Sequence, residues 1–195
     1  NPEEAAEIVN RIKLPEGAGK LTPAGSNLNG PSAKVLDEHI LAPLGFMRKD
    51  AWLCDLLPET RLNESQQKVI NGEYKKCQEK YGLNKVTVPN RPTEFCDSER
   101  CKEIVTELEE SQASLLVLLG DIPIQQFLNT VASVDFTTLQ EYKDRYGYGN
   151  PTEMTINGRT IKVLPLAHPR QIGGLGFHSK EWKKIHQDWE TQKCR

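Results

Sequence analysis

The sequence predicts an α/β fold with a parallel sheet, and three apolar runs carry that prediction. The run Ser114–Gly120 ends at a glycine and leads into a helical pattern, as the strand of a βα unit does. The run Ile161–Leu166 stops before His168-Pro169, because proline cannot continue a sheet ladder and holds the preceding residue extended. The run Asp50–Leu57 is read as a further buried strand that is interrupted by one acid, Asp55.

Length and composition indicate one globular domain over residues 1–195. Of the residues, 37% are hydrophobic and 27% are charged, and no apolar run is long enough to span a membrane. No secretory signal is visible, and the chain begins without a methionine, so we expect a missing upstream segment. The five cysteines include no CxxC pair, which favours reduced thiols, a cytoplasmic protein, and no metal or cofactor.

Charge is distributed unevenly along the chain. Residues 159–195 carry eight basic and three acidic side chains, a net charge of +5 that leaves −7 for the rest. Because this segment contains His168, an anionic ligand is expected there, although a lysine-rich C-terminal helix is also typical of a solvated surface. The overall acidity excludes a protein that coats nucleic acid, but it permits a short contact.

Helices are expected between these strands. Hydrophobic periodicity and caps place them at Glu3–Lys13, Ser32–Leu44, Ser65–Tyr81, Asp97–Ser111, residues 121–128 and Ser179–Trp189. The segment Leu62–Asn90 is the expected insertion, and Val131–Gly158 is expected to be irregular. The loop that ends in Asn29-Gly30-Pro31-Ser32 precedes a helix, so its backbone N–H groups either bind an anion or a ring carbonyl, or simply cap that helix.

Polar groups follow each of the three predicted strands. If the strands are neighbours in one parallel sheet, Asp55, Gly120-Asp121 and His168-Pro169 all open onto the same crevice. An acid, a histidine and backbone donors around a slot suit cleavage of a bond whose leaving group gains negative charge. The alternative for His168 is a histidine that only caps the strand end.

The order of these elements resembles the uracil-DNA glycosylase superfamily. The resemblance rests on the glycine-rich loop with its helix, a strand that ends near an acid, the "VLLG" strand and the "PLAHP" strand end. Asn90-Arg91-Pro92, followed by Glu94 and Cys101, is similar to the segment before the third core strand in bacterial and archaeal branches. The resemblance implies a three-layer α/β/α sandwich with a central, mainly parallel four-stranded sheet, whose first strand and motif precede residue 1.

The resemblance also implies roles for single residues. His168 matches the histidine that donates a hydrogen bond to the departing base, and Asp55 stands where the family usually has an asparagine that reads the pyrimidine edge. Asp55 either disfavours uracil or positions the attacking water. The expected substrate-binding residues are Asn29, Gly30, Ser32, Gly120, Asp121, Pro169, Arg170 and Gln171.

Three features depart from the family pattern. Residues 1–45 contain no aromatic side chain to stack on a base, Arg170 replaces the usual serine after His-Pro, and the early cysteine pair of the iron–sulfur branches is absent. The expected function is hydrolysis of the N-glycosidic bond of a base in DNA, with DNA or a nucleobase-containing small molecule as partner. The alternatives are a non-catalytic module that keeps the base pocket, and a phosphate-ligand enzyme that uses the Asn29–Ser32 loop.

Overall fold

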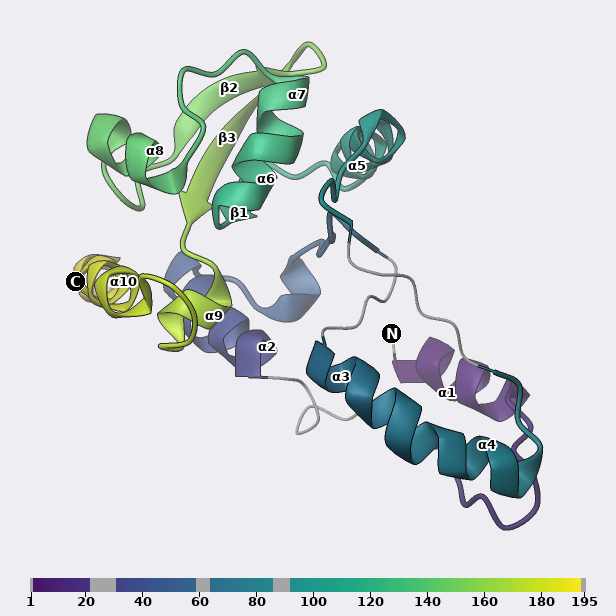
Figure 1. Cartoon of the computed structure of the whole chain (residues 1–195). Coiled ribbons are helices and arrows are strands. Elements are labelled where there is room, and N and C mark those ends of the chain that lie inside the picture. Colours follow the sequence, from purple (N-terminus) through teal and green to yellow (C-terminus); the bar gives the residue numbers. More distant parts are fainter. Residues whose placement is uncertain (1, 22–30, 59–63, 86–91, 194–195) are drawn as a thin grey trace. The chain divides into compact units, whose positions relative to one another are not determined.

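The fold is described by a computed structural model that covers residues 2–21, 31–58, 64–85 and 92–193 (Figure 1). The chain divides into two compact units. One comprises Asn1–Asn29 and Glu59–Thr93, and the other comprises Gly30–Pro58 and Glu94–Arg195. All the described residues that were predicted to form the site belong to the second unit.

The first unit is helical in its described part. Helix α1 (Pro2–Arg11) agrees with the expected N-terminal helix, and α3 (Glu64–Val69), η5 (Ile70–Tyr74) and α4 (Lys75–Tyr81) form one continuous helical run. The run ends at Gly82, whose φ of +64° is the left-handed conformation that glycine adopts most readily. Most of its side chains are exposed, as the polar sequence predicts.

The second unit contains a three-stranded mixed sheet, which overturns the predicted four-stranded parallel sheet. Strands β1 (Leu115–Leu119) and β3 (Arg159–Leu166) are parallel, with Leu119 opposite Leu166. Strand β2 (Thr152–Ile156) pairs antiparallel with the outer side of β3, so the order is β1-β3-β2. The turn Asn157-Gly158, with φ of +48° and +77°, joins β2 to β3 as a tight hairpin.

The predicted strand Asp50–Leu57 does not form. A 3₁₀ turn, η4 (Arg48–Asp50), is followed by irregular backbone through Pro58. Trp52 and Leu53 are 58% and 47% exposed, so the apolar side chains of this segment are not those of a buried strand. Instead of a ladder, side chains hold the segment: the Trp52 indole N–H donates to Glu107, and Arg100 donates to the Asp55 carbonyl.

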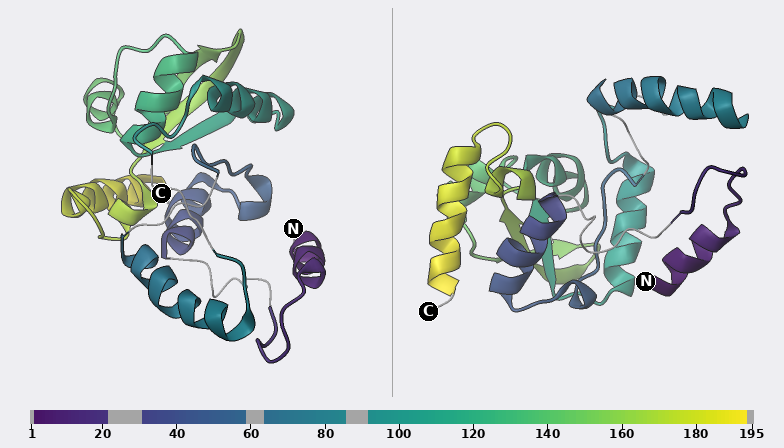
Figure 2. Two further views of the ribbon diagram at one scale, coloured as in Figure 1. Left: turned by 45° about the vertical axis from the view of Figure 1, so that its right-hand side comes forward. Right: turned by 90° about the horizontal axis from the view of Figure 1, so that it is seen from below.

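Helices surround the sheet of the second unit. They are α2 (Pro31–Val35), η2 (Leu36–Leu41), η3 (Ala42–Leu44), α5 (Ser98–Glu110), α6 (Asp121–Pro123), η6 (Ile124–Leu128), α7 (Asn129–Val131), α8 (Leu139–Tyr146), α9 (Pro169–Ile172) and α10 (Ser179–Lys193). Helix α8 and strand β2 occupy the stretch that was expected to be irregular. Figures 1 and 2 place α9 and α10 beyond the carboxyl end of β3, and α2 packs against α9.

The core lies between β3 and the helices of this unit. Val163, Leu164 and Leu166 of β3 are buried, and Phe127, Phe136 and Tyr142 pack in the same cluster. Proline at position 165 is also buried within the central strand, in register with Leu118. Among the described helices, none is long and apolar enough to cross a bilayer.

Candidate active site at the strand ends

The carboxyl ends of β1 and β3 lie side by side. The backbone N–H of Gly120 donates to the carbonyl of Leu166 at 2.8 Å, one step beyond the last paired residues. Gly120 has φ of +89° and ψ of −174°, and a Cβ there would lie 3.3 Å from the Cβ of His168. Gly120 is therefore required by both its backbone conformation and the close approach of His168.

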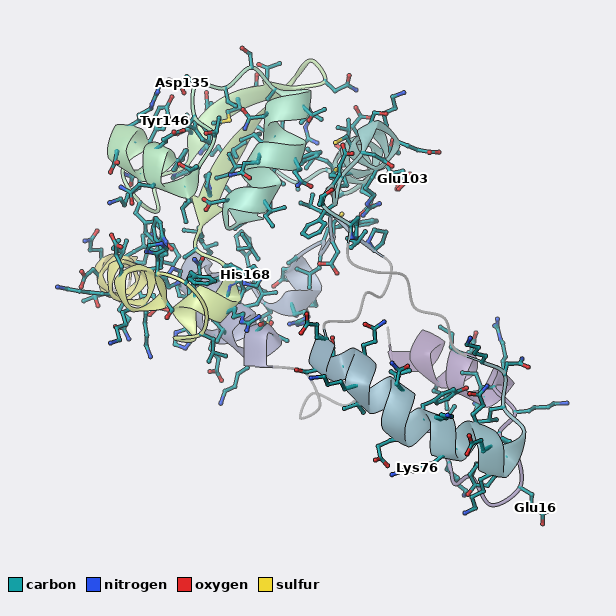
Figure 3. All side chains as sticks on the ribbon, viewed as in Figure 1. Glu16, Lys76, Glu103, Asp135, Tyr146 and His168 are labelled. Atoms are coloured by element: carbon teal, nitrogen blue, oxygen red, sulfur yellow. The ribbon has the colours of Figure 1, made fainter. Side chains whose placement is uncertain are left out.

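His168 begins helix α9 and is held by it. Nδ1 of the His168 ring accepts a hydrogen bond from the backbone N–H of Arg170 at 3.1 Å. The backbone N–H of His168 donates to the side-chain oxygen of Gln171 at 3.3 Å. Pro169 occupies the first helical position, where its missing N–H costs nothing. Figure 3 labels His168 next to α9. The capping role considered for His168 is thus present, and it gives Nδ1 of the ring a hydrogen-bond partner.

This geometry sets the protonation state of His168. Partial desolvation by neighbouring protein atoms, and to a lesser degree the Arg170 charge, lower the pKa of the ring, while the negative charge of Asp55 opposes them. Because Nδ1 accepts a hydrogen bond, the proton of the neutral ring is on Nε2. No described residue accepts a hydrogen bond from Nε2, so at neutral pH the side chain presents a neutral N–H donor.

Asp55 lies on an exposed loop within electrostatic range of His168. Its backbone carbonyl accepts a hydrogen bond from Arg100 at 2.7 Å, and Arg100 forms ion pairs with Glu103 and Glu107 of the same helix. Helix α5 thus holds the main chain of Asp55, while no described residue donates a hydrogen bond to its carboxylate. The charge of Asp55 therefore acts on the His168 ring, and it does so from a loop and not from the end of the predicted strand.

Asp121 is directed elsewhere. Its carboxylate accepts the backbone N–H of Leu139 at 2.8 Å and so satisfies a free donor in the first turn of α8. We had expected Asp121 to bind substrate with its neighbour Gly120. The contact with α8 gives it a structural role instead.

The glycine-rich loop is only partly described. Asn29 and Gly30 lie outside the described residues. Ser32 is exposed on α2, and this helix packs against α9, where Val35 Cγ2 would be 3.4 Å from a Cβ at Gly173. The helix that follows the loop is therefore next to the His168 turn, as a shared crevice requires.

Exposed apolar and basic side chains follow His168. Phe177 is 90% exposed and Leu175 is 52% exposed, in the loop between α9 and α10. The side chain of Gln171 reaches this loop and donates to the Phe177 carbonyl at 3.2 Å. Arg170 is exposed on α9, and Lys180, Lys183 and Lys184 are exposed on α10. Our sequence reasoning missed Phe177, although an aromatic residue directly after the glycine-rich turn Gly173–Gly176 was a usable signal.

Two further residues were missed. They are Tyr148 and His186. The backbone N–H of the buried Ala167, directly before His168, donates to the hydroxyl of Tyr148 at 3.0 Å, and this hydroxyl is hydrogen-bonded to the ring of the buried His186. The sequence analysis singled out neither residue: Tyr148 lies in the stretch Val131–Gly158 that was expected to be irregular, and His186 lies within the expected helix Ser179–Trp189. No periodicity distinguishes a buried histidine from an exposed one, so only the tertiary contacts identify this pair.

Other features of the described residues lie apart from His168. A hollow of about 350 Å³ is lined by residues 133–136, Tyr146 and the strands β2 and β3, and it includes none of the predicted site residues. No group of three or more metal-ligating side chains occurs among the described residues.

Comparison with known proteins assigns no family. No family model matches the chain, and neither a curated protein nor a solved structure matches it.

Proposed function

We propose that the chain hydrolyses the N-glycosidic bond of a base in DNA, in the manner of the uracil-DNA glycosylase superfamily that its motifs resemble. The observation that carries the proposal is the neutral His168 ring, with Nδ1 occupied by the Arg170 N–H and Nε2–H directed to no described residue. A base that leaves its sugar as an anion needs a fixed donor at the atom where charge develops. The Nε2–H group of His168 is such a donor.

The neighbouring residues suit a nucleotide that has left its stack. Enzymes of this kind extrude the target base into a pocket and meet the cost of unstacking it. Apolar side chains that enter a duplex often fill the space left behind. Phe177 is almost fully exposed three residues before Lys180, the first of the exposed lysines of α10, and this position supports such a role. The basic side chains Arg170, Lys180, Lys183 and Lys184 would contact the phosphates.

Asp55 supplies the second polar group of the site. An ionised carboxylate offers only acceptors, so it opposes the carbonyl of uracil and suits a base edge with adjacent N–H donors. In the other role considered for it, the carboxylate holds the attacking water. Its charge stabilises the positive charge that develops on the sugar as the base departs in either case.

The test is base release from oligonucleotides that contain uracil, hypoxanthine, xanthine or an alkylated base. Loss of one such donor typically lowers the rate by about 10²- to 10³-fold, and we expect this for His168→Ser. Serine retains an oxygen that caps α9, so the variant separates the donor from the cap. His178→Asn is the control, because His178 is exposed and has a φ of +54°, which asparagine tolerates. Equal rates for His168→Ser and wild type would exclude the proposed role.

A base-binding module without cleavage remains the second candidate. It is favoured by the position of Asp121, whose carboxylate is used by α8, so that fewer polar groups face the strand ends than the sequence predicts. Under this alternative, wild-type protein binds the modified oligonucleotide in a salt-dependent way and releases no base from any substrate.

A further inference from the structure

A buried series of hydrogen bonds leads from the residue before His168 to helices α10 and η2 of the second unit. The N–H of Ala167 donates to the Tyr148 hydroxyl at 3.0 Å, and this hydroxyl lies 2.6 Å from Nδ1 of His186. Nε2 of His186 lies 2.7 Å from the backbone carbonyl of His39. These hydrogen bonds join the end of β3, the loop between α8 and β2, helix α10 and η2.

Each proton in this chain has one possible place. A carbonyl only accepts, so Nε2 of His186 carries a proton and donates to His39. In the neutral ring Nδ1 is then an acceptor, the Tyr148 hydroxyl donates to it, and the tyrosine oxygen is left to accept the N–H of Ala167. Burial lowers the pKa of His186 and raises that of Tyr148, so both side chains are neutral. The hydrogen bond to the His39 carbonyl and the carboxylate of Glu190 raise the pKa of His186, but the effect of burial is larger and the net shift is downward.

Packing holds Tyr148 in place. Its ring centroid lies 5.9 Å from that of Trp182 and 6.4 Å from that of Trp189, both on α10. Next to it, Gly149 leaves room for the Trp189 indole, because a Cβ at that position would be only 2.0 Å from the ring. Tyr148 is therefore a fixed partner for the strand end.

We propose that Tyr148, supported by His186, is a positioning residue that sets the direction in which His168 presents its Nε2–H group. The ladder between β1 and β3 ends at the bond from Gly120 to Leu166, so it does not hold the next peptide. Ala167 is fully buried, and its N–H is the last backbone donor before the histidine. The bond to Tyr148 replaces the missing ladder bond at this point. The effect of Tyr148 on catalysis rests on the proposed function, but its effect on the position of the His168 ring does not.

The first experiment needs no activity. Ring ¹⁵N signals of His168 report which nitrogen is protonated and at what pH the ring titrates. In wild type we expect the Nε2–H form and a lowered pKa. In Tyr148→Phe we expect mixed forms and a pKa that rises toward the ordinary histidine value, because the freed ring enters solvent and is less affected by the charge of Arg170. The weaker effect of the Asp55 charge acts in the opposite direction, but desolvation is the largest cause of the shift.

Tyr142→Phe is the matched control. Tyr142 is buried, and its hydroxyl also donates a hydrogen bond to β3, at the Val163 carbonyl, which is five residues before His168. This variant loses buried hydrogen bonds without touching Ala167, so the His168 signals stay as in wild type. Should Tyr148→Phe fail to fold, His186→Gln retains a donor toward the His39 carbonyl and removes the acceptor of Tyr148. Wild-type His168 signals in a folded Tyr148→Phe or His186→Gln protein, or equal changes in Tyr142→Phe, would overturn the proposal.

The second experiment applies the same variants to base release. A misplaced donor lowers kcat by about 10- to 100-fold with KM little changed, whereas the Tyr142→Phe control retains the wild-type kcat. If wild type releases no base, the proposed function fails, and the NMR comparison still decides whether Tyr148 positions His168. If wild type is active and Tyr148→Phe keeps its kcat, the positioning role fails alone.

Discussion

Gly120→Ala tests whether the close contact between the two strand ends controls His168. Gly120 has φ of +89° and ψ of −174°, a region that only glycine occupies readily. A methyl group there would meet the Cβ of His168 at 3.3 Å, so His168 must move by a few tenths of an ångström. The variant therefore combines backbone strain with a displacement of the candidate catalytic ring.

The backbone strain is worth about 1–3 kcal/mol. In a chain of this length, each kcal/mol lowers Tm by about 2–4 °C, so we expect a decrease of about 2–12 °C. A displacement of this size also lowers base release, because rates depend steeply on the position of a donor. Stability is measured by thermal and urea unfolding, and the position of His168 by its ring NMR signals.

Gly158→Ala is the control for strain. Gly158 has φ of +77° in the β2–β3 turn, and a Cβ there meets no atom within 4 Å. It loses stability for the same backbone reason but leaves His168 unaffected. If Gly120→Ala unfolds at the wild-type temperature and keeps the His168 signals, the described contact between β1 and β3 does not constrain the ring.

Two other changes test the same region. Asp55→Asn places an amide N–H donor beside a carbonyl acceptor, so we expect the release of uracil from a single-stranded oligonucleotide to rise by roughly a hundredfold if the carboxylate repels the uracil carbonyl. Strong uracil release by the wild type that the substitution lowers would indicate that Asp55 positions water. For pH, the lowered pKa of His186 means that the unfolded state binds the extra proton first. The free energy of unfolding therefore falls as pH drops below about 6.5, by at most about 1.4 kcal/mol per pH unit from this group, until the pH reaches the lowered value. Urea unfolding between pH 7.5 and 5 measures the slope. His168 adds a slope of the same sign, because its pKa is also lowered, so His186→Gln should reduce the slope by the contribution of His186. An unchanged slope in that variant would contradict the assignment.

Local pattern was sufficient for the continuous elements. The apolar runs of β1 and β3 and the periodic helices α5 and α10 were predicted near their observed bounds, because their side chains have one clear periodicity. The strand end before His168-Pro169 was also predicted, because Pro169 has no N–H for a ladder. The same rule did not predict that Pro165 lies inside the central strand, in register with Leu118. The meeting of Gly120 and His168 followed from the parallel arrangement of those two strands.

Tertiary structure decided what a pattern leaves open. Asp50–Leu57 has the composition of a strand, yet Arg100 and Glu107 hold it by its main chain and its tryptophan, and no ladder forms among the described residues. Asp121 was chosen for its place after β1, but a free N–H of α8 binds its carboxylate. The pairing of Tyr148 with His186 joins residues 38 positions apart. Composition and periodicity indicate which face of an element is buried, but they do not specify which polar group across the core satisfies a buried donor. The candidate site depends on those pairings, so only the tertiary structure could define it.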